Sequence, residues 1–192
     1  IGLLAHTQIG EIHIRLTAKA ADKTQADALN APLEAEIRGR LKDFIFGIDE
    51  ETYEGVLGSL LLQSGLTLAV AETGFGSSII QTLKMMEGNT EFFLLGLTVV
   101  SPEMAQKILG RQESAFAEQG FCSGEIARSL AEGIRHLASA HLGLALAGQS
   151  SKEKKQDHLA FIALAHARGT DLIEQRWPFA MRFIENRMTK MA

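Results

Sequence analysis

A glycine-bearing turn between a predicted strand and a predicted helix is the best candidate site in this sequence. The apolar strand Leu66–Glu72 leads into the run Thr73-Gly74-Phe75-Gly76-Ser77-Ser78, and a helix follows through Met86. Glycines let a backbone approach a ligand closely, and the first amides of a helix attract anions. The run lacks the third glycine of a dinucleotide-binding fingerprint and the Gly-Lys-Ser/Thr of a P-loop. Two interpretations stay open: a plain capped turn, and a site where an anion or nucleotide is held by Thr73, Gly74, Gly76 and Ser77.

Few other residues suggest chemistry. Glu72 ends an apolar strand, where its carboxylate could equally cap the following helix or orient a substrate. The six histidines are scattered. His136 and His141 are five residues apart instead of four, and no HExxH motif occurs, so surface or structural histidines are expected and no metal is predicted. The single cysteine, Cys122, has no partner for nucleophilic catalysis or for an internal disulfide, and no cofactor is predicted.

Composition narrows the class of protein. The 192 residues are 46% hydrophobic and 22% charged, enough for one or two globular domains. The net charge of −4 gives no basic face for duplex nucleic acid. No apolar run reaches the roughly 18 residues of a membrane span, and nothing at the start resembles a secretory signal. A reducing, cytoplasmic location is expected, and the start at Ile1 without Met suggests the back part of a longer protein.

Two regions are predicted, 1–49 and 50–192. In the first, Glu11–Lys19 alternates as a half-buried strand with Ile12 inward, and Thr24–Lys42 carries an apolar residue at every fourth position of a helix. Phe44–Phe46 reads as a short strand, which completes a small α+β module.

The second region alternates helices and strands, which predicts a layered α/β domain with a mixed or parallel sheet. Strands are expected at Leu66–Glu72, Phe92–Val100, Leu142–Ala147 and Leu159–His166. Helices are expected around Val56–Leu61, from Pro102, from Ser123 to His141 as the longest one, and from Pro178.

At the glycine-bearing turn the sequence resembles a known family. The stretch LTLAVAETGFGS is similar to the opening of the C-terminal domain of the CinA (competence/damage-inducible) family, which reads A-E-S-x-T-G-G there. The similarity runs without a gap from about Thr52 to the end. It includes Gly88, Phe93, Gly96, Ser101, Leu109-Gly110, Gly120, Ser123, Ala131 and Gly133. The runs EIHIRLTAK and APLEAEIR resemble the KH-type linker that precedes this domain in long CinA proteins.

The resemblance implies nicotinamide mononucleotide deamidase chemistry, which needs an activated hydroxyl, a lysine base and donors for the oxyanion and phosphate. It also implies an N-terminal molybdopterin-binding-like domain in the same protein and a homodimer. Several positions depart from the family pattern. Thr73 replaces the serine of A-E-S, while Phe75 and Ser77 replace the threonine and second glycine of T-G-G.

The family's Y-S-x-x-x-K motif keeps its serine as Ser101, but Val100 and Ala105 replace the tyrosine and the lysine. Lys107 is no simple substitute, because two residues along a helix turn about 200° around its axis. The family's glycine-rich substrate loop keeps one glycine, Gly148. A hydroxyl without its base loses general-base assistance, typically worth about 10²–10⁴-fold.

Three interpretations compete. The first is a degenerate CinA domain that keeps the fold and acts as a non-catalytic scaffold, binding or oligomerisation module. The second is an active amidohydrolase with Thr73 as nucleophile and Lys84 or Lys152 as base, so enzyme status stays open. The third is nucleic-acid binding through the KH-like module, which is disfavoured because Gly39-Arg40-Leu41-Lys42 lacks the second glycine of a GXXG loop. The candidate ligand-binding set is Glu72, Gly74, Gly76, Ser77, Ser101 and Gly148.

Overall fold

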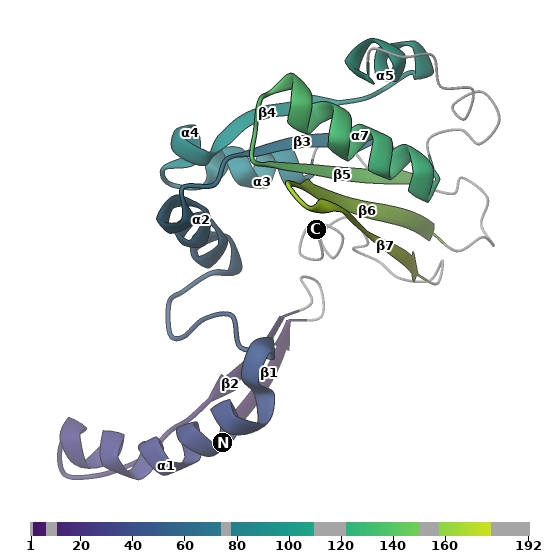
Figure 1. Cartoon of the computed structure of the whole chain (residues 1–192). Coiled ribbons are helices and arrows are strands. Elements are labelled where there is room, and N and C mark those ends of the chain that lie inside the picture. The colour runs from purple at the N-terminus through teal and green to yellow at the C-terminus, as the bar shows by residue number, and fades with distance from the viewer. Residues whose placement is uncertain (1, 7–10, 74–77, 110–121, 150–157, 178–192) are drawn as a thin grey trace.

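The structure, a computed structural model, describes residues 2–6, 11–73, 78–109, 122–149 and 158–177. Its centre is one five-stranded mixed sheet with helices on both faces, as the alternating pattern predicted (Figure 1). The strand order is β4-β3-β5-β6-β7. The bounds are β3 Leu68–Thr73, β4 Phe93–Thr98, β5 Leu142–Gln149, β6 His158–His166 and β7 Gly169–Trp177.

Strand direction decides which residues share an edge of the sheet. β3 pairs in parallel with both β4 and β5, whereas β5 with β6 and β6 with β7 are antiparallel. The carboxyl ends of β3, β4, β5 and β7 therefore lie at the same edge. Thr73 is opposite Ala147 there, and Glu72 is opposite Thr98.

Alternating residues of the central strands supply two different cores. Leu68 and Val70 join one cluster with the helices α2 (Tyr53–Ser64), α3 (Ser78–Met85) and α4 (Asn89–Phe92). Ala69 and Ala71 join the other with α5 (Pro102–Leu109) and α7 (Gly124–Leu137). On this second face the sheet offers alanines, so α7 can lie close to it.

Gly143 on β5 shows how close α7 lies. A Cβ built at this glycine would be 2.1 Å from the Ala131 carbonyl oxygen and 2.6 Å from the Arg135 Cβ, both on α7. No side chain fits in that space, so glycine is required by the close approach of strand and helix. Five α7 residues are buried against the sheet: Ile126, Ala127, Leu130, Ala131 and Ile134.

The N-terminal elements lie beyond α2, away from α5 and α7 (Figure 1). β1 (Gly2–His6) and β2 (Glu11–Arg15) form an antiparallel hairpin, and α1 (Lys23–Leu41) follows. The predicted helix is confirmed, with Pro32 inside it and Asp22 as its N-cap. The predicted half-burial of the strand is wrong at Ile12, which is 66% exposed. No residue of α1 is buried.

Several predicted elements differ from the structure. Phe44–Phe46 is not a strand: Lys42–Phe44 forms the 3-10 helix η1, and among the described residues no third strand pairs with β1 or β2. α7 ends at Leu137 instead of His141, since Ser139 takes a positive φ of 51° before β5 begins. α1, with 19 residues, is longer than α7, with 14.

The strand β7 and the short helix α4 were not predicted from the sequence. The helix predicted from Pro178 lies outside the described residues. None of the helices in the described ranges is both long and apolar enough to cross a membrane.

Candidate functional site

The carboxyl edge of the sheet brings several of the predicted site residues together. Glu72 and Thr73 end β3, and Gly148 lies near the end of β5 beside them. The Gly148 backbone N–H donates a hydrogen bond to the Thr73 Oγ1 over 3.3 Å. Gly74, Gly76 and Ser77 lie outside the described residues.

Glu72 caps the helix that follows it. Its Oε1 accepts a hydrogen bond from the Ile79 N–H (3.1 Å) and its Oε2 accepts one from the Ile80 N–H (3.0 Å). The residue is fully buried, with 0% of its surface exposed. Of the two roles left open by the sequence, the structure therefore shows capping of α3.

This cap changes the electrostatics of the turn. Burial raises the pKa of Glu72, and the hydrogen bonds from Ile80 and Ile79 offset part of that rise. The carboxylate occupies two of the amides that a helix N-terminus usually offers to an anion. A bound phosphate would therefore use neither the Ile79 amide nor the Ile80 amide.

Thr73 lies inside the protein. Its exposed fraction is 0%, and alternation along β3 directs it to the face covered by α5 and α7. Its hydroxyl oxygen accepts from Gly148, as described above, so the hydroxyl is built into the link between β3 and β5.

Ser101 lies after β4, whose end is at the same edge. Its hydroxyl oxygen accepts a hydrogen bond from the Met104 N–H over 3.2 Å, which caps α5. The hydroxyl also bonds the carboxylate of Glu103, and this bond lowers the pKa of Glu103. Ser101 is thus a helix cap in this structure.

The two positions aligned with the family's tyrosine and lysine differ in burial. Val100 is 75% exposed, whereas Ala105 is 0% exposed and belongs to the core cluster with Val99 and Ile126. Lys107 is exposed and interacts electrostatically with Glu103 one turn earlier on α5. Position 105 therefore supplies packing between α5 and α7.

The structure describes one of the two lysines that the sequence suggested as replacement bases. Lys84 lies in the last turn of α3 and is exposed. Six residues separate it from Ser78, which places it about 9 Å further along the helix axis. Because α3 starts at the carboxyl edge and runs away from it, Lys84 lies at the far end from Thr73. Lys152 lies outside the described residues.

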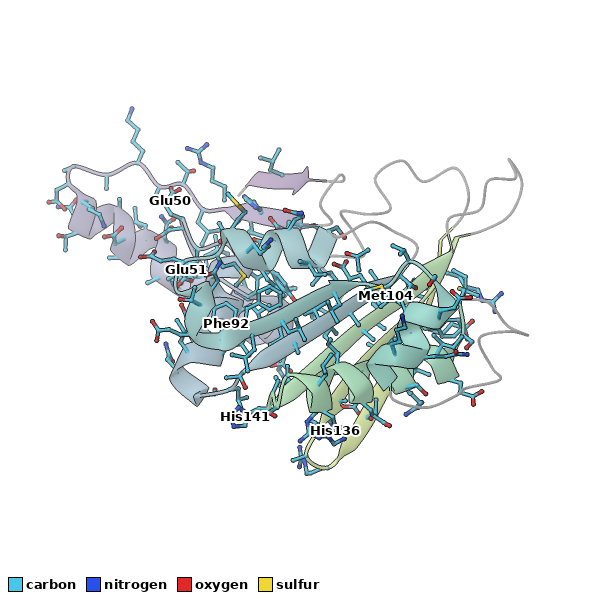
Figure 2. The ribbon with its side chains drawn as sticks, turned by 90° about the horizontal axis from the view of Figure 1, so that it is seen from above. Glu50, Glu51, Phe92, Met104, His136 and His141 are labelled. Atoms are coloured by element: carbon cyan, nitrogen blue, oxygen red, sulfur yellow. The ribbon has the colours of Figure 1, made fainter. Side chains whose placement is uncertain are left out.

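The four histidines whose side chains the structure describes, His13, His136, His141 and His166, are exposed or bonded to neighbouring residues. Figure 2 shows His136 and His141 near the end of α7 and the start of β5. The His141 Nδ1 accepts a hydrogen bond from the Thr67 N–H over 3.1 Å. This contact is at the amino end of β3, at the opposite edge of the sheet from Thr73. Within the described ranges, no three His, Cys, Asp or Glu side chains group as metal ligands.

The apolar residues of the α3–α4 segment differ in burial. Phe92 is buried, and Met86 packs against the same core cluster. Met85, by contrast, has 86% of its surface exposed. Cys122 is half-buried, and its thiol donates to the Leu159 carbonyl oxygen over 3.4 Å.

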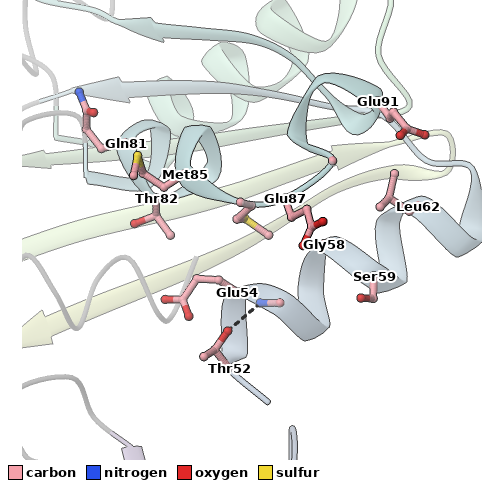
Figure 3. A pocket seen from close by; sticks show the side chains of 13 residues that line it. Thr52, Glu54, Gly58, Ser59, Leu62, Gln81, Thr82, Met85, Glu87 and Glu91 are labelled. Carbon is pink, nitrogen blue, oxygen red and sulfur yellow. Dashed lines mark hydrogen bonds between the residues drawn. The ribbon is translucent and has the colours of Figure 1, made fainter. Parts of the chain in front are cut away.

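Sequence reasoning missed a groove between α2 and the α3–α4 segment, which includes Met85 and three glutamates (Figure 3). The lining residues of its two walls are at least 19 positions apart in the chain, Leu62 and Gln81 being the nearest pair, so no local motif predicts the groove. Its glutamates, Glu54, Glu87 and Glu91, each read in the sequence as an ordinary exposed residue and gave no signal.

Comparison with family models decides the family. A model described as the CinA C-terminal domain matches residues 50–192, and one described as the damage-inducible protein CinA KH domain matches residues 1–47. The chain belongs to the CinA family. Both parts of the resemblance seen in the sequence are thereby confirmed.

Relatives with this family name are longer than the chain. A competence-damage inducible protein of Moorella thermoacetica is 38% identical over 139 residues, which are 72% of this chain and 34% of the relative. One of Desulforamulus reducens is 34% identical over 172 residues, 88% of this chain and 42% of the relative. The chain thus spans less than half the length of each.

Solved CinA-family structures share the fold. A competence or damage-inducible protein from Enterobacter asburiae has a TM-score of 0.63 at 21% identity, covering 73% of this chain and 94% of that one. A CinA superfamily protein from Escherichia coli has a TM-score of 0.60 at 16% identity, covering 79% and 98%. The predicted layered α/β fold is confirmed.

Proposed function

We propose that this chain is the C-terminal region of a CinA-type protein whose deamidase site is degenerate, and that it works as a non-catalytic binding or assembly module. The observation that carries this proposal is the state of the Thr73 hydroxyl. It is fully buried and bonded to the Gly148 amide, where a nucleophile would need to meet a carboxamide carbon.

The general base is the second missing part. Deamidation requires a group that removes the proton of the attacking hydroxyl. Ala105 is a buried packing residue, and Lys84 lies at the far end of α3. Ser101, the retained hydroxyl of the motif, caps α5. Thr73, Ser101 and Ala105, three described positions that align with the reaction machinery, therefore have structural roles.

The proposal includes ligand binding without turnover. The ligand would be a nucleotide or a phosphate held at the turn by the glycines Gly74 and Gly76 and by the Ser77 hydroxyl. Since Glu72 occupies the Ile79 and Ile80 amides, these residues would supply the contacts. We further propose a cytoplasmic homodimer, units at 1–49 and 50–192, and an upstream molybdopterin-binding-like domain in the full protein, with no nucleic-acid or membrane partner.

The alternative is an active amidohydrolase on nicotinamide mononucleotide or a relative. One observation favours it: Thr73 keeps a hydroxyl at the carboxyl edge, with the Gly148 backbone donor 3.3 Å away. Backbone donors of this kind stabilise oxyanions in acyl-transfer enzymes. The missing base must then come from outside the described residues.

The deciding experiment measures ammonia release from nicotinamide mononucleotide by the purified chain. Thr73→Ala is the test variant, and Thr90→Ala, an exposed threonine on α4, is the matched control. We expect no turnover by the chain or by either variant. Turnover that disappears only in Thr73→Ala would contradict the proposal and establish the amidohydrolase.

Binding is measured separately, by calorimetric titration with nicotinamide mononucleotide and with ADP-ribose. We expect heat from at least one ligand at millimolar concentration or below. No heat from either ligand in a folded sample would refute ligand binding at this turn. Assembly would then be the proposed function of the chain.

A further inference from the structure

The groove between α2 and the α3–α4 segment has a volume of about 900 Å³ (Figure 3). Glycines on both of its walls, Gly58 on α2 and Gly88 before α4, leave space between them. A Cβ at Gly58 would lie 3.0 Å from the Met86 Cε, and one at Gly88 would lie 3.2 Å from the Leu62 Cδ1. Both walls belong to the folded C-terminal unit, since α2 and α4 pack on the same core cluster through Leu61 and Phe92.

The groove combines apolar surface with negative charge. Met85 is 86% exposed and Leu62 is 38% exposed along it. Glu54, Glu87 and Glu91 line it, and among the described lining residues there is no lysine or arginine. Methionine-rich grooves accept apolar helices and peptides, and unbalanced carboxylates select a basic one. The occupant should therefore be a basic, apolar chain segment.

Residues 178–192 have this chemistry and lie outside the helices and strands that the structure describes. This segment carries Arg182, Arg187 and Lys190 against a single acidic residue, Glu185. Its large apolar residues are interleaved with these charges: Phe179, Met181, Phe183, Ile184, Met188 and Met191. Its net charge is thus opposite to that of the three groove glutamates.

The segment also begins within reach of the groove. β7 ends at Trp177, and the strand directions place that end at the same edge as Ser78, where α3 begins. From there α3 leads directly to the groove residues Thr82 and Met85. Fifteen residues span about 50 Å when extended and about 22 Å as a helix, so either form is long enough.

We propose that the groove is the docking site for residues 178–192 of the same chain. Its carboxylates pair with the segment's basic residues, and Met85 and Leu62 pack on its apolar ones. The segment then ties the end of β7 to α2 and α3. This inference is independent of whether the Thr73 site binds or turns over a ligand.

The test is amide hydrogen exchange of residues 178–192 in the full chain. The groove reversal Glu87→Lys with Glu91→Lys should raise exchange across the segment by about tenfold, since it removes two partly exposed charge pairs and adds repulsion. The control Glu36→Lys with Glu50→Lys makes the same charge change outside the groove and should leave the segment unchanged. Exchange of β3 and β5 amides monitors the fold.

A charge swap makes the test specific. Arg187→Glu with Lys190→Glu should raise exchange as the groove reversal does, and combining the two reversals should restore protection. Equal exchange in the unmodified chain and the groove reversal would overturn the proposal. Failure of the swap to restore protection would also overturn it. Protection that increases with protein concentration would overturn it as well, because a second copy would then be the occupant.

Discussion

Gly143→Ala is the substitution that most directly tests how the central sheet and α7 fit together. The new Cβ would lie 2.1 Å from the Ala131 carbonyl oxygen and 2.6 Å from the Arg135 Cβ. The first of these is a backbone atom inside a helix, and a rotamer change cannot move it. The strand and the helix must therefore separate by roughly 1 Å, which strains a close-packed core.

The expected loss in the free energy of unfolding follows from the packing contacts that this separation disturbs. Overpacked cores lose about 1–3 kcal/mol, and a clash with backbone belongs at the upper end of this range. Moving α7 also loosens the contacts of its five buried residues with the alanine face of the sheet. We expect Gly143→Ala to lower the free energy of unfolding by about 3 kcal/mol, a large part of typical domain stability.

Urea unfolding followed by far-ultraviolet circular dichroism measures this loss. The matched control is Gly39→Ala on α1, where a Cβ would have no atom within 4 Å. The same chemical change there should raise helix stability by about 0.5–1 kcal/mol, so the two variants should shift in opposite directions. A Gly143→Ala free energy within about 0.5 kcal/mol of the unmodified chain would refute the argument, since surface substitutions fall in that range.

Two further predictions concern the helix caps. Glu72→Gln should remove a pH dependence: burial raises the pKa of Glu72, so the unmodified chain loses stability relative to the variant as pH rises above about 4.5. Urea titrations across pH measure this difference, and a constant difference would contradict it. Ser123→Ala should cost about 1 kcal/mol, because the Ser123 Oγ accepts from the Ile126 N–H over 3.2 Å. Ser123→Asp should recover most of that loss in thermal unfolding, and equal losses in both variants would exclude the cap as the cause.

The sequence predicted the elements whose patterns are local. Gly65 ends α2 with a positive φ of 62°, Pro102 starts α5, and the apolar runs became central strands. β7 escaped prediction because Asp171, Glu174 and Arg176 break its apolar pattern, as suits a strand at the edge of a sheet.

The site was less predictable, since its contacts join distant parts of the chain. Gly148 reaches Thr73 across 75 positions, and no spacing rule foretells that bond. Glu72 was recognised as unusual, but the choice between cap and substrate ligand depended on where α3 begins. The groove glutamates gave no signal, because each reads alone as an ordinary exposed residue.

The stability of the helix α1 should depend on salt. It contains no buried residue, yet its 19 residues carry ion pairs one turn apart, Lys23–Asp27, Glu34–Arg38 and Glu36–Arg40. The helix is thus stabilised by local charge pairs and not by a core, and its residues span about 28 Å. Each exposed pair contributes about 0.3–0.5 kcal/mol and weakens with added salt. Added salt should therefore make this helix fray more readily, because it weakens the charge pairs that stabilise it.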